Sequence, residues 1–205
     1  VTLEGGEVAG KSTVLATVRD VLAAHGIDVV MTREPGGTPA GEAIRGVLLD
    51  PQYRGLAAET ELLLMFAARA ELVRNVIRPA LATGRWVLSD RFTDASYAYQ
   101  GGGRGQPAAR IAELERWTTD GLMPDLTLLL DLPVREGLAR AGRRGGVDRI
   151  EMENETFFEC VRVAYRARAA ADPRRFRVID AGRPLADVLA SVRGTIDVFV
   201  AESLA

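Results

Sequence analysis

The chain reads Gly5-Gly6-Glu7-Val8-Ala9-Gly10-Lys11-Ser12 between an apolar segment and a segment with helical periodicity. This stretch matches the pattern G-x-x-x-x-G-K-[ST], in which backbone N–H groups and a helix N-terminus surround phosphate oxygens. Lys11 would contact the outer phosphates of a nucleoside triphosphate, and the Ser12 hydroxyl would bind Mg²⁺. Valine at position 8 is a departure, because β-branched residues disfavour a positive φ. The expected phosphate contacts come from Gly5, Gly6, Glu7, Val8, Ala9, Gly10, Lys11, Ser12 and Thr13.

Short apolar segments alternate with helical segments along the rest of the chain. This alternation predicts a parallel sheet with helices on both faces. We therefore expect an α/β protein, a P-loop NTPase-type three-layer sandwich with a five-stranded parallel sheet, folded as one domain over residues 1–205. The glycine-rich stretches Gly101–Gly103 and Gly142–Gly146 are expected to be mobile loops. The expected strands are Val1–Glu4, Ile27–Thr32, Trp86–Asp90, Leu126–Asp131 and Phe176–Asp180, and the expected helices include Lys11–His25, Ala57–Thr83, Val134–Arg143 and Glu153–Ala171.

Composition excludes several classes of protein. The 26 basic and 28 acidic residues give a net charge of −2, which argues against nucleic-acid binding by bulk positive charge. The single cysteine, Cys160, excludes an internal disulfide and a cysteine-based zinc cluster. No apolar run approaches the roughly 20 residues that cross a bilayer. We expect a cytoplasmic protein that binds neither membrane nor nucleic acid.

Arginine is the dominant cation of the sequence. Of the 26 basic residues only Lys11 is lysine, so the Asn-Lys-x-Asp guanine reader of GTP switches cannot be present as well. Ligands of open parallel sheets bind beyond the carboxyl ends of the strands, and arginines gather there. The planar guanidinium binds phosphate oxygens in pairs. A kinase with two phosphate-bearing substrates is therefore favoured, with cations at Arg33, Arg91, Arg140, Arg143, Arg144 and Arg149.

Several further motifs resemble those of one family, bacterial thymidylate kinase, from nearly one end of the chain to the other. They are Thr32-Arg33-Glu34-Pro35-Gly36-Gly37-Thr38, Met65-Phe66-Ala67-Ala68-Arg69, Asp90-Arg91-Phe92, the run from Ser96 to Gly105, and Asp148-Arg149-Ile150-Glu151. The resemblance implies the reaction ATP + dTMP → ADP + dTDP with Mg²⁺, in a homodimer.

The resemblance also implies residues that bind dTMP. Phe66 would stack on thymine, with Arg69 on the same helix face as donor to a base carbonyl. Gln100 would read the pyrimidine edge beside Ser96, and Tyr99 would crowd the 2′ position of the sugar. The phosphate would be held by Arg33, Arg45 and Arg91. Without the resemblance, the sequence favours a structural interpretation of each: Phe66 as a core residue, Arg45 as part of a solvated helix face, and Ser96–Gln100 as an ordinary polar loop.

For catalysis the resemblance implies a loop carboxylate, a metal site and a lid. Glu7 would lie between the two substrates, and Asp90 would stand near Mg²⁺ with Ser12 and Glu151. Asp131 is expected to be structural. The arginine-rich lid, at about residues 140–151, would close on the transferring phosphoryl group. Lys11, Arg91, Arg144 and Arg149 are the expected catalytic cations, with Arg143 on the ATP phosphates.

Two other functions remain open at this point. One is a kinase for another monophosphate, such as UMP or CMP, although the Phe66/Arg69 pair and the Ser96–Gln100 string argue against it. The other is a regulatory module that binds nucleotides without turnover, which only Val8 favours.

Overall fold

The computed structural model describes residues 1–6, 9–141 and 148–204. In this part of the chain a five-stranded sheet has the order β2-β3-β1-β4-β5, and every neighbouring pair is parallel. The predicted strands are confirmed. Trp86–Asp90 and Phe176–Asp180 begin and end as predicted, and the other three are displaced by one or two residues. The strands are β1 (Thr2–Gly5), β2 (Val29–Arg33), β3 (Trp86–Asp90), β4 (Thr127–Asp131) and β5 (Phe176–Asp180).

Helices join these strands and extend beyond the last one. Thr38 caps the second helix, because its hydroxyl oxygen accepts a bond from the backbone N–H of Gly41. Asn154 caps the eighth helix in the same way, through Phe157. The helices are α1 (Lys11–Ala24), α2 (Pro39–Leu49), a short 3₁₀ turn η1 (Pro51–Tyr53), α3 (Ala58–Leu72), α4 (Arg78–Ala82), α5 (Thr93–Ser96), α6 (Ala108–Thr119), α7 (Val134–Ala141), α8 (Glu155–Ala171) and α9 (Leu185–Leu204).

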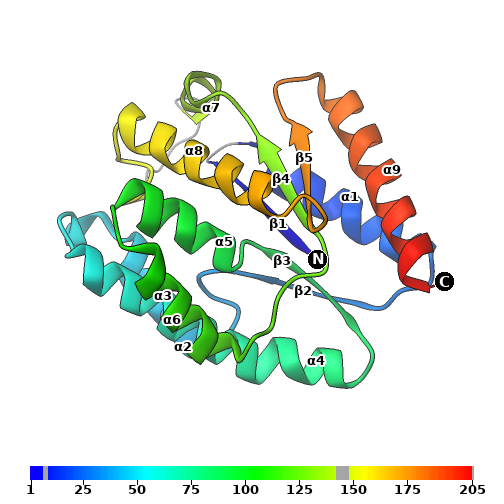
Figure 1. Ribbon diagram of the computed structural model, residues 1–205, viewed down its shortest axis with the longest axis horizontal. Coiled ribbons are helices and arrows are strands. Elements are labelled where there is room, and N and C mark those ends of the chain that lie inside the picture. The colour runs from blue at the N-terminus through cyan, green and yellow to red at the C-terminus, as the bar shows by residue number, and fades with distance from the viewer. Residues whose placement is uncertain (7–8, 142–147, 205) are drawn as a thin grey trace.

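Alternate residues of the central strands face two different helical layers. Leu128 and Leu130 of β4 pack in a core with α1 and α9, whereas Leu129 between them packs with residues of α8. In β3, Leu88 joins the first core, while Val87 packs against the helices that precede the strand. Figure 1 shows α1 and α9 on one side of the sheet and α8, α5 and α3 on the other. The predicted three-layer α/β fold is confirmed.

The predicted helix Ala57–Thr83 is present but changes its winding. After α3 the chain forms a π-helical turn, η2 (Val73–Ile77), and continues directly into α4. Pro79 lies at the start of α4 and cannot donate a backbone hydrogen bond, so the ladder must adjust there.

The expectation of a mobile loop at Gly101–Gly103 is wrong. These glycines belong to a second π-helical segment, η3 (Tyr97–Gly103), which packs against α8. A Cβ on Gly102 would lie 2.8 Å from the carbonyl oxygen of Cys160, and one on Gly103 would overlap the ring of Phe157. The glycines therefore permit close helix packing. Gly142–Gly146, the other expected loop, falls outside the described residues.

Candidate active site

The first strand delivers the phosphate-binding stretch to the carboxyl edge of the sheet, between β1 and α1. Gly5 is required there, because its φ is +141° and a Cβ would lie 2.6 Å from the carbonyl oxygen of Leu130. Gly10 adopts a left-handed conformation (φ +87°) at the start of α1, and no side-chain hydrogen bond caps that helix in the described part of the chain. The N-terminus of α1 is thus open to an anion.

Lys11 folds back across this loop. Its Nζ lies 3.0 Å from the carbonyl oxygen of Gly6 and 3.5 Å from that of Gly5. Ser12 and Thr13 are exposed in the first turn of α1, while Ala9 of the same loop is buried in the core with residues of α1 and α9. Glu7 and Val8 lie outside the described residues.

Beside Lys11 a cavity of about 210 Å³ opens among residues from several elements. Four of its lining residues are cations, three are acids, and the remainder form an apolar and aromatic wall. The three arginines predicted to hold the dTMP phosphate are all among them. The lining residues are Lys11, Arg33, Glu34, Pro35, Arg45, Leu49, Met65, Asp90, Arg91, Ala95, Tyr99, Asp148 and Ile150.

Arg33 and Arg45 bring positive charge to one side of the cavity. Arg33 pairs with Glu42 at 2.9 Å, and Arg45 donates to the carbonyl oxygen of Pro35 at 2.9 Å. Burial, together with the positive charges of Arg33 and Arg91, lowers the pKa of the Arg45 guanidinium. Cations that disfavour one another in this way are stabilised by a shared anion.

Arg91 is held in a strained conformation directly after β3. Its φ is +70°, a value that costs a residue with a side chain about 1 kcal/mol or more. The guanidinium donates to the carbonyl oxygen of Gly5 at 2.7 Å and to the hydroxyl oxygens of Tyr165 and Tyr99 at 3.0 Å each. It also lies 4.7 Å above the Tyr99 ring. These contacts fix Arg91 at the junction of the phosphate loop and the cavity.

Glu4 supports this arrangement from inside the sheet, and sequence reasoning missed it. Its carboxyl oxygens accept from the backbone N–H of Phe92 and from the Tyr165 hydroxyl, both at 2.7 Å. Burial and the nearby charge of Asp94 raise the pKa of Glu4 to about 8, although Arg91 opposes them. No local sequence pattern separates this carboxyl from an exposed one, because its partners are up to 161 positions away.

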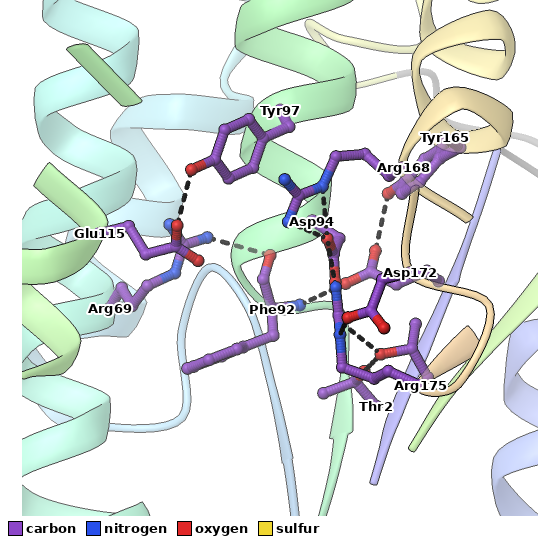
Figure 2. A network of polar contacts seen from close by, with 12 residues as sticks. Thr2, Arg69, Phe92, Asp94, Tyr97, Glu115, Tyr165, Arg168, Asp172 and Arg175 are labelled. Atoms are coloured by element: carbon purple, nitrogen blue, oxygen red, sulfur yellow. Dashed lines mark hydrogen bonds and ion pairs between the residues drawn. The ribbon is translucent and has the colours of Figure 1, made fainter. Parts of the chain in front are cut away.

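Phe66 and Arg69 lie behind the cavity wall. Phe66 is 1% exposed and Arg69 is 2% exposed, and neither lines the cavity, whereas Met65 does. The Arg69 guanidinium stacks 4.4 Å above the Phe66 ring, and it donates to Glu34 at 2.8 Å, to Ser96 at 3.0 Å and to the carbonyl oxygen of Phe92 at 3.2 Å. Figure 2 shows the last of these contacts. Contacts of this pair with a base stay predictions.

Gln100 and Arg149 are also buried, and both contact Glu61 of α3. Gln100 Nε2 donates to Glu61 at 2.9 Å, and Arg149 donates to Glu61 and to the carbonyl oxygen of Leu48 at 2.7 Å each. A contact of Arg149 with a transferring phosphoryl group would require these bonds to break. Arg143 and Arg144, the other expected lid cations, lie outside the described residues.

The carboxyl end of the expected lid reaches the cavity through other residues. Asp148 and Ile150 line it. Glu151, an expected metal ligand, instead accepts a bond from the backbone N–H of Asp148 at 3.2 Å. Asp131, expected to be structural, forms a two-bond ion pair with Arg162, at 2.7 and 3.0 Å.

Asp90 is the carboxylate best placed for a cation. It lines the cavity at the end of β3, and its Oδ1 is buried without a hydrogen-bond partner in the described part of the chain. Those residues contain no cluster of three or more potential metal ligands. A magnesium ion needs no such cluster when substrate phosphates and water complete its octahedron, so Asp90 and the exposed Ser12 hydroxyl fit it.

A second buried carboxylate, Asp94, braces the segment that carries Arg91. Arg168 donates to it at 2.8 Å and Arg175 at 2.6 Å (Figure 2). Arg175 also donates to Thr127 at 2.9 Å. The Arg168 guanidinium lies 3.9 Å above the ring of Tyr97. The residues of this network are distant in sequence, and no sequence motif predicted their contacts.

Within the described residues, none of the helices is both long and apolar enough to cross a membrane. The model of the thymidylate kinase family matches residues 3–192. A thymidylate kinase from Halorhodospira halophila is 59% identical over 198 residues, which cover 96% of this chain and 92% of that protein. One from Ectopseudomonas mendocina is 58% identical, covering 94% and 91%. With a phosphate-binding loop opening onto a cation-lined cavity, and with these matches, the chain belongs to the thymidylate kinase family.

Proposed function

We propose that this cavity holds dTMP while the adjoining loop holds the phosphates of MgATP, so that the γ-phosphate passes to the dTMP phosphate. The observation that carries the proposal is the position of Lys11, which belongs to the loop and lines the cavity as well. A donor phosphate on the loop and an acceptor phosphate among the arginines would therefore meet at one place. Such proximity supplies much of the rate in phosphoryl transfer.

The proposed catalysis is charge neutralisation with little proton transfer. The attacking atom is a phosphate oxygen that is already ionised near pH 7, so no general base is needed. Lys11 and Arg91 would neutralise charge on the transferring group, while Arg33 and Arg45 hold the acceptor phosphate. Glu7 would orient the acceptor, and Arg143, Arg144 and Arg149 would add positive charge from the lid. A cation at the transition state can contribute 10³–10⁵ in rate.

Magnesium is part of the proposal. Asp90 and Ser12 would hold the ion, directly or through its water, with Glu151 nearby once the lid closes. When bound, the ion neutralises charge on the donor phosphates. The buried Oδ1 of Asp90, which has no hydrogen-bond partner among the described residues, supports this assignment.

The base and sugar would occupy the cavity between α3 and η3. Tyr99, which lines the cavity and contacts Arg91, would lie against the sugar. The base would lie against Met65, with Phe66 and Arg69 behind that wall, and Ser96 and Gln100 would complete the pocket. Because Phe66, Arg69, Ser96 and Gln100 are buried here, base binding would require a rearrangement of the wall.

ADP formation from MgATP with dTMP, dUMP, UMP, CMP, AMP and GMP tests the activity. We expect dTMP to be preferred, and turnover mainly with UMP or CMP would contradict the proposal. Binding of ATP and dTMP without ADP formation would support the non-catalytic alternative.

The substitution Lys11→Met should lower kcat by at least about a hundredfold. As a control, Arg19→Met removes an exposed cation that pairs with its neighbour Asp20 on α1, and it should leave kcat unchanged.

We also propose that the protein forms a homodimer through α3 and α6. Trp117 is 80% exposed and Leu63 is 57% exposed, and both line a groove between these helices. Glu59, Glu113, Arg110 and Arg116 line the same groove, so both signs of charge are present on one face. A two-fold interface requires such self-complementarity. Sedimentation should give a dimer for the wild type, and a monomer after Leu63→Ser combined with Trp117→Ser. A monomeric wild type would contradict this proposal.

A further inference from the structure

One face of α3 contacts the segment formed by α5 and η3 at two points, the last residue of α5 and a residue of η3. Glu61, Met65 and Arg69 are spaced by four residues and therefore share a helix face. Met65 lines the cavity, Arg69 donates to the Ser96 hydroxyl, and Glu61 accepts from the Gln100 amide. Ser96 and Gln100 are also four residues apart, so the Arg69–Ser96 and Glu61–Gln100 contacts lie on either side of Met65 in the cavity wall.

Glu61 is a buried carboxylate that stays ionised. Although burial alone would raise its pKa, hydrogen bonds from Gln100, Arg104 and Arg149 hold the pKa of Glu61 below its ordinary value. The distances are 2.9 Å to Gln100 Nε2, 3.2 Å to Arg104 Nε and 2.7 Å to Arg149 Nη2. An ionised carboxylate only accepts hydrogen bonds.

This charge state determines which way the Gln100 amide faces. Its NH₂ group must point at Glu61, so its carbonyl oxygen points elsewhere. Gln100 is fully buried, and its Oε1 has no hydrogen-bond partner in the described part of the chain. A buried acceptor without a donor is costly, and a ligand that brings a donor removes that cost.

Pyrimidine bases differ in what they offer to such an acceptor. Thymine and uracil carry an N–H donor at N3, whereas cytosine has a lone pair there. We propose that Glu61 is a specificity-positioning residue, which fixes Gln100 as an acceptor and so favours bases with an N3–H over cytosine. The proposal rests on the proposed function, in which the acceptor base lies against Gln100. Glu61 itself touches no substrate and acts through the amide.

The substitution Glu61→Gln tests this assignment. A neutral amide at position 61 can accept or donate, so Gln100 can turn over and present its NH₂ group to cytosine N3. We expect the ratio of kcat/KM for dTMP over dCMP to fall about tenfold or more, the scale of one mismatched buried hydrogen bond. The dTMP over dUMP ratio should stay within about twofold of wild type, because thymine and uracil share the same N3–H edge. A general loosening of the pocket would change both ratios.

Glu153→Gln is the matched control. Glu153 accepts from Arg104 at 2.6 Å on the same network but does not contact Gln100, so both ratios should be kept. If Glu61→Gln fails to fold because Arg149 is left buried without its partner, Arg149→Met can be added and the same ratios measured. An unchanged dTMP over dCMP ratio in a folded Glu61 variant overturns this inference and leaves the proposed function standing. A wild type that does not prefer dTMP would instead contradict the proposed function.

Discussion

Asp94 and Glu61 are built alike but serve different parts of the molecule. Each is a buried carboxylate with two arginine partners, Arg168 and Arg175 in one case and Arg104 and Arg149 in the other. The difference lies in what else each group contacts. Arg175 also donates to Thr127 of β4, whose hydroxyl lies 2.8 Å from that of Thr2 in β1. Among the described residues Glu61 has no hydrogen bond to a strand, and it accepts one from a side chain of η3 instead.

Two buried ion-pair clusters of similar composition can therefore have different roles, depending on which elements they connect. The Asp94 cluster ties α5 and α8 to the two central strands, so its loss should be felt mainly in the stability of the fold. The Glu61 cluster ties α3, η3 and the carboxyl end of the expected lid around the cavity. Its loss should be felt mainly in which base is accepted. The following experiments separate these two consequences.

The largest expected effect belongs to Asp94→Ala. Removing this carboxylate leaves Arg168 and Arg175 without their shared partner, and breaking a buried pair in this way costs about 3–5 kcal/mol. Urea unfolding should show that loss in the free energy of unfolding. The dTMP over dCMP ratio of the remaining folded enzyme should be unchanged.

Asp28→Ala is the control for that experiment. Asp28 pairs with Arg85 in an exposed position, where the two side chains are 70% and 43% accessible. Exposed pairs of this kind contribute less than about 1 kcal/mol. If Asp94→Ala were as mild as Asp28→Ala, or if it altered the choice of base, the distinction between the two clusters would fail.

A smaller effect is expected from Gly102→Ala, which lies where the two clusters meet. Gly102 is on η3, the segment of Gln100, and its neighbours are on α8, the helix of Arg168. The added methyl group would lie 2.7 Å from Ala164 Cβ and 2.8 Å from a backbone oxygen of α8, which cannot turn away. Such overpacking costs about 1–3 kcal/mol.

Unfolding of Gly102→Ala should be measured beside Gly46→Ala. Gly46 is in α2, and a Cβ there meets nothing within 4 Å, so alanine should be neutral or stabilising by up to about 1 kcal/mol. We also expect KM for dTMP to rise in Gly102→Ala alone, because η3 must move away from α8. An unchanged KM would mean that the two clusters act independently.

The sequence predicts those features of the fold that depend on neighbouring residues, such as strands and the phosphate-binding motif. Two strands were predicted to the residue, and Lys11 lies beside Arg33 and Arg91 at the strand ends, as predicted. The contacts behind the cavity wall could not be predicted, because Glu61 bonds to residues far away in sequence. Gln100 is 39 positions away and Arg149 is 88 positions away. Glycines in η3 suggested mobility because sequence does not reveal the helix that packs on them. Burial of Phe66 was foreseen only as one of two alternatives.

The last experiment follows a pH dependence from Glu4, whose pKa is raised where that of Glu61 is lowered. A carboxyl with a folded-state pKa of about 8 and an ordinary value of 4.5 keeps its proton on folding. The folded protein therefore loses stability as pH rises from 4.5 toward 8, by about 1 kcal/mol between pH 6 and 7.

Glu4→Gln, which mimics the protonated form, removes this contribution. The free energy of unfolding of wild type minus that of Glu4→Gln should fall over this interval and level off above pH 8. Because the charge of Asp94 helps to raise the pKa of Glu4, Asp94→Asn should move the levelling to lower pH. A difference that is flat from pH 5 to 9 would mean that Glu4 is ionised throughout, as Glu61 is.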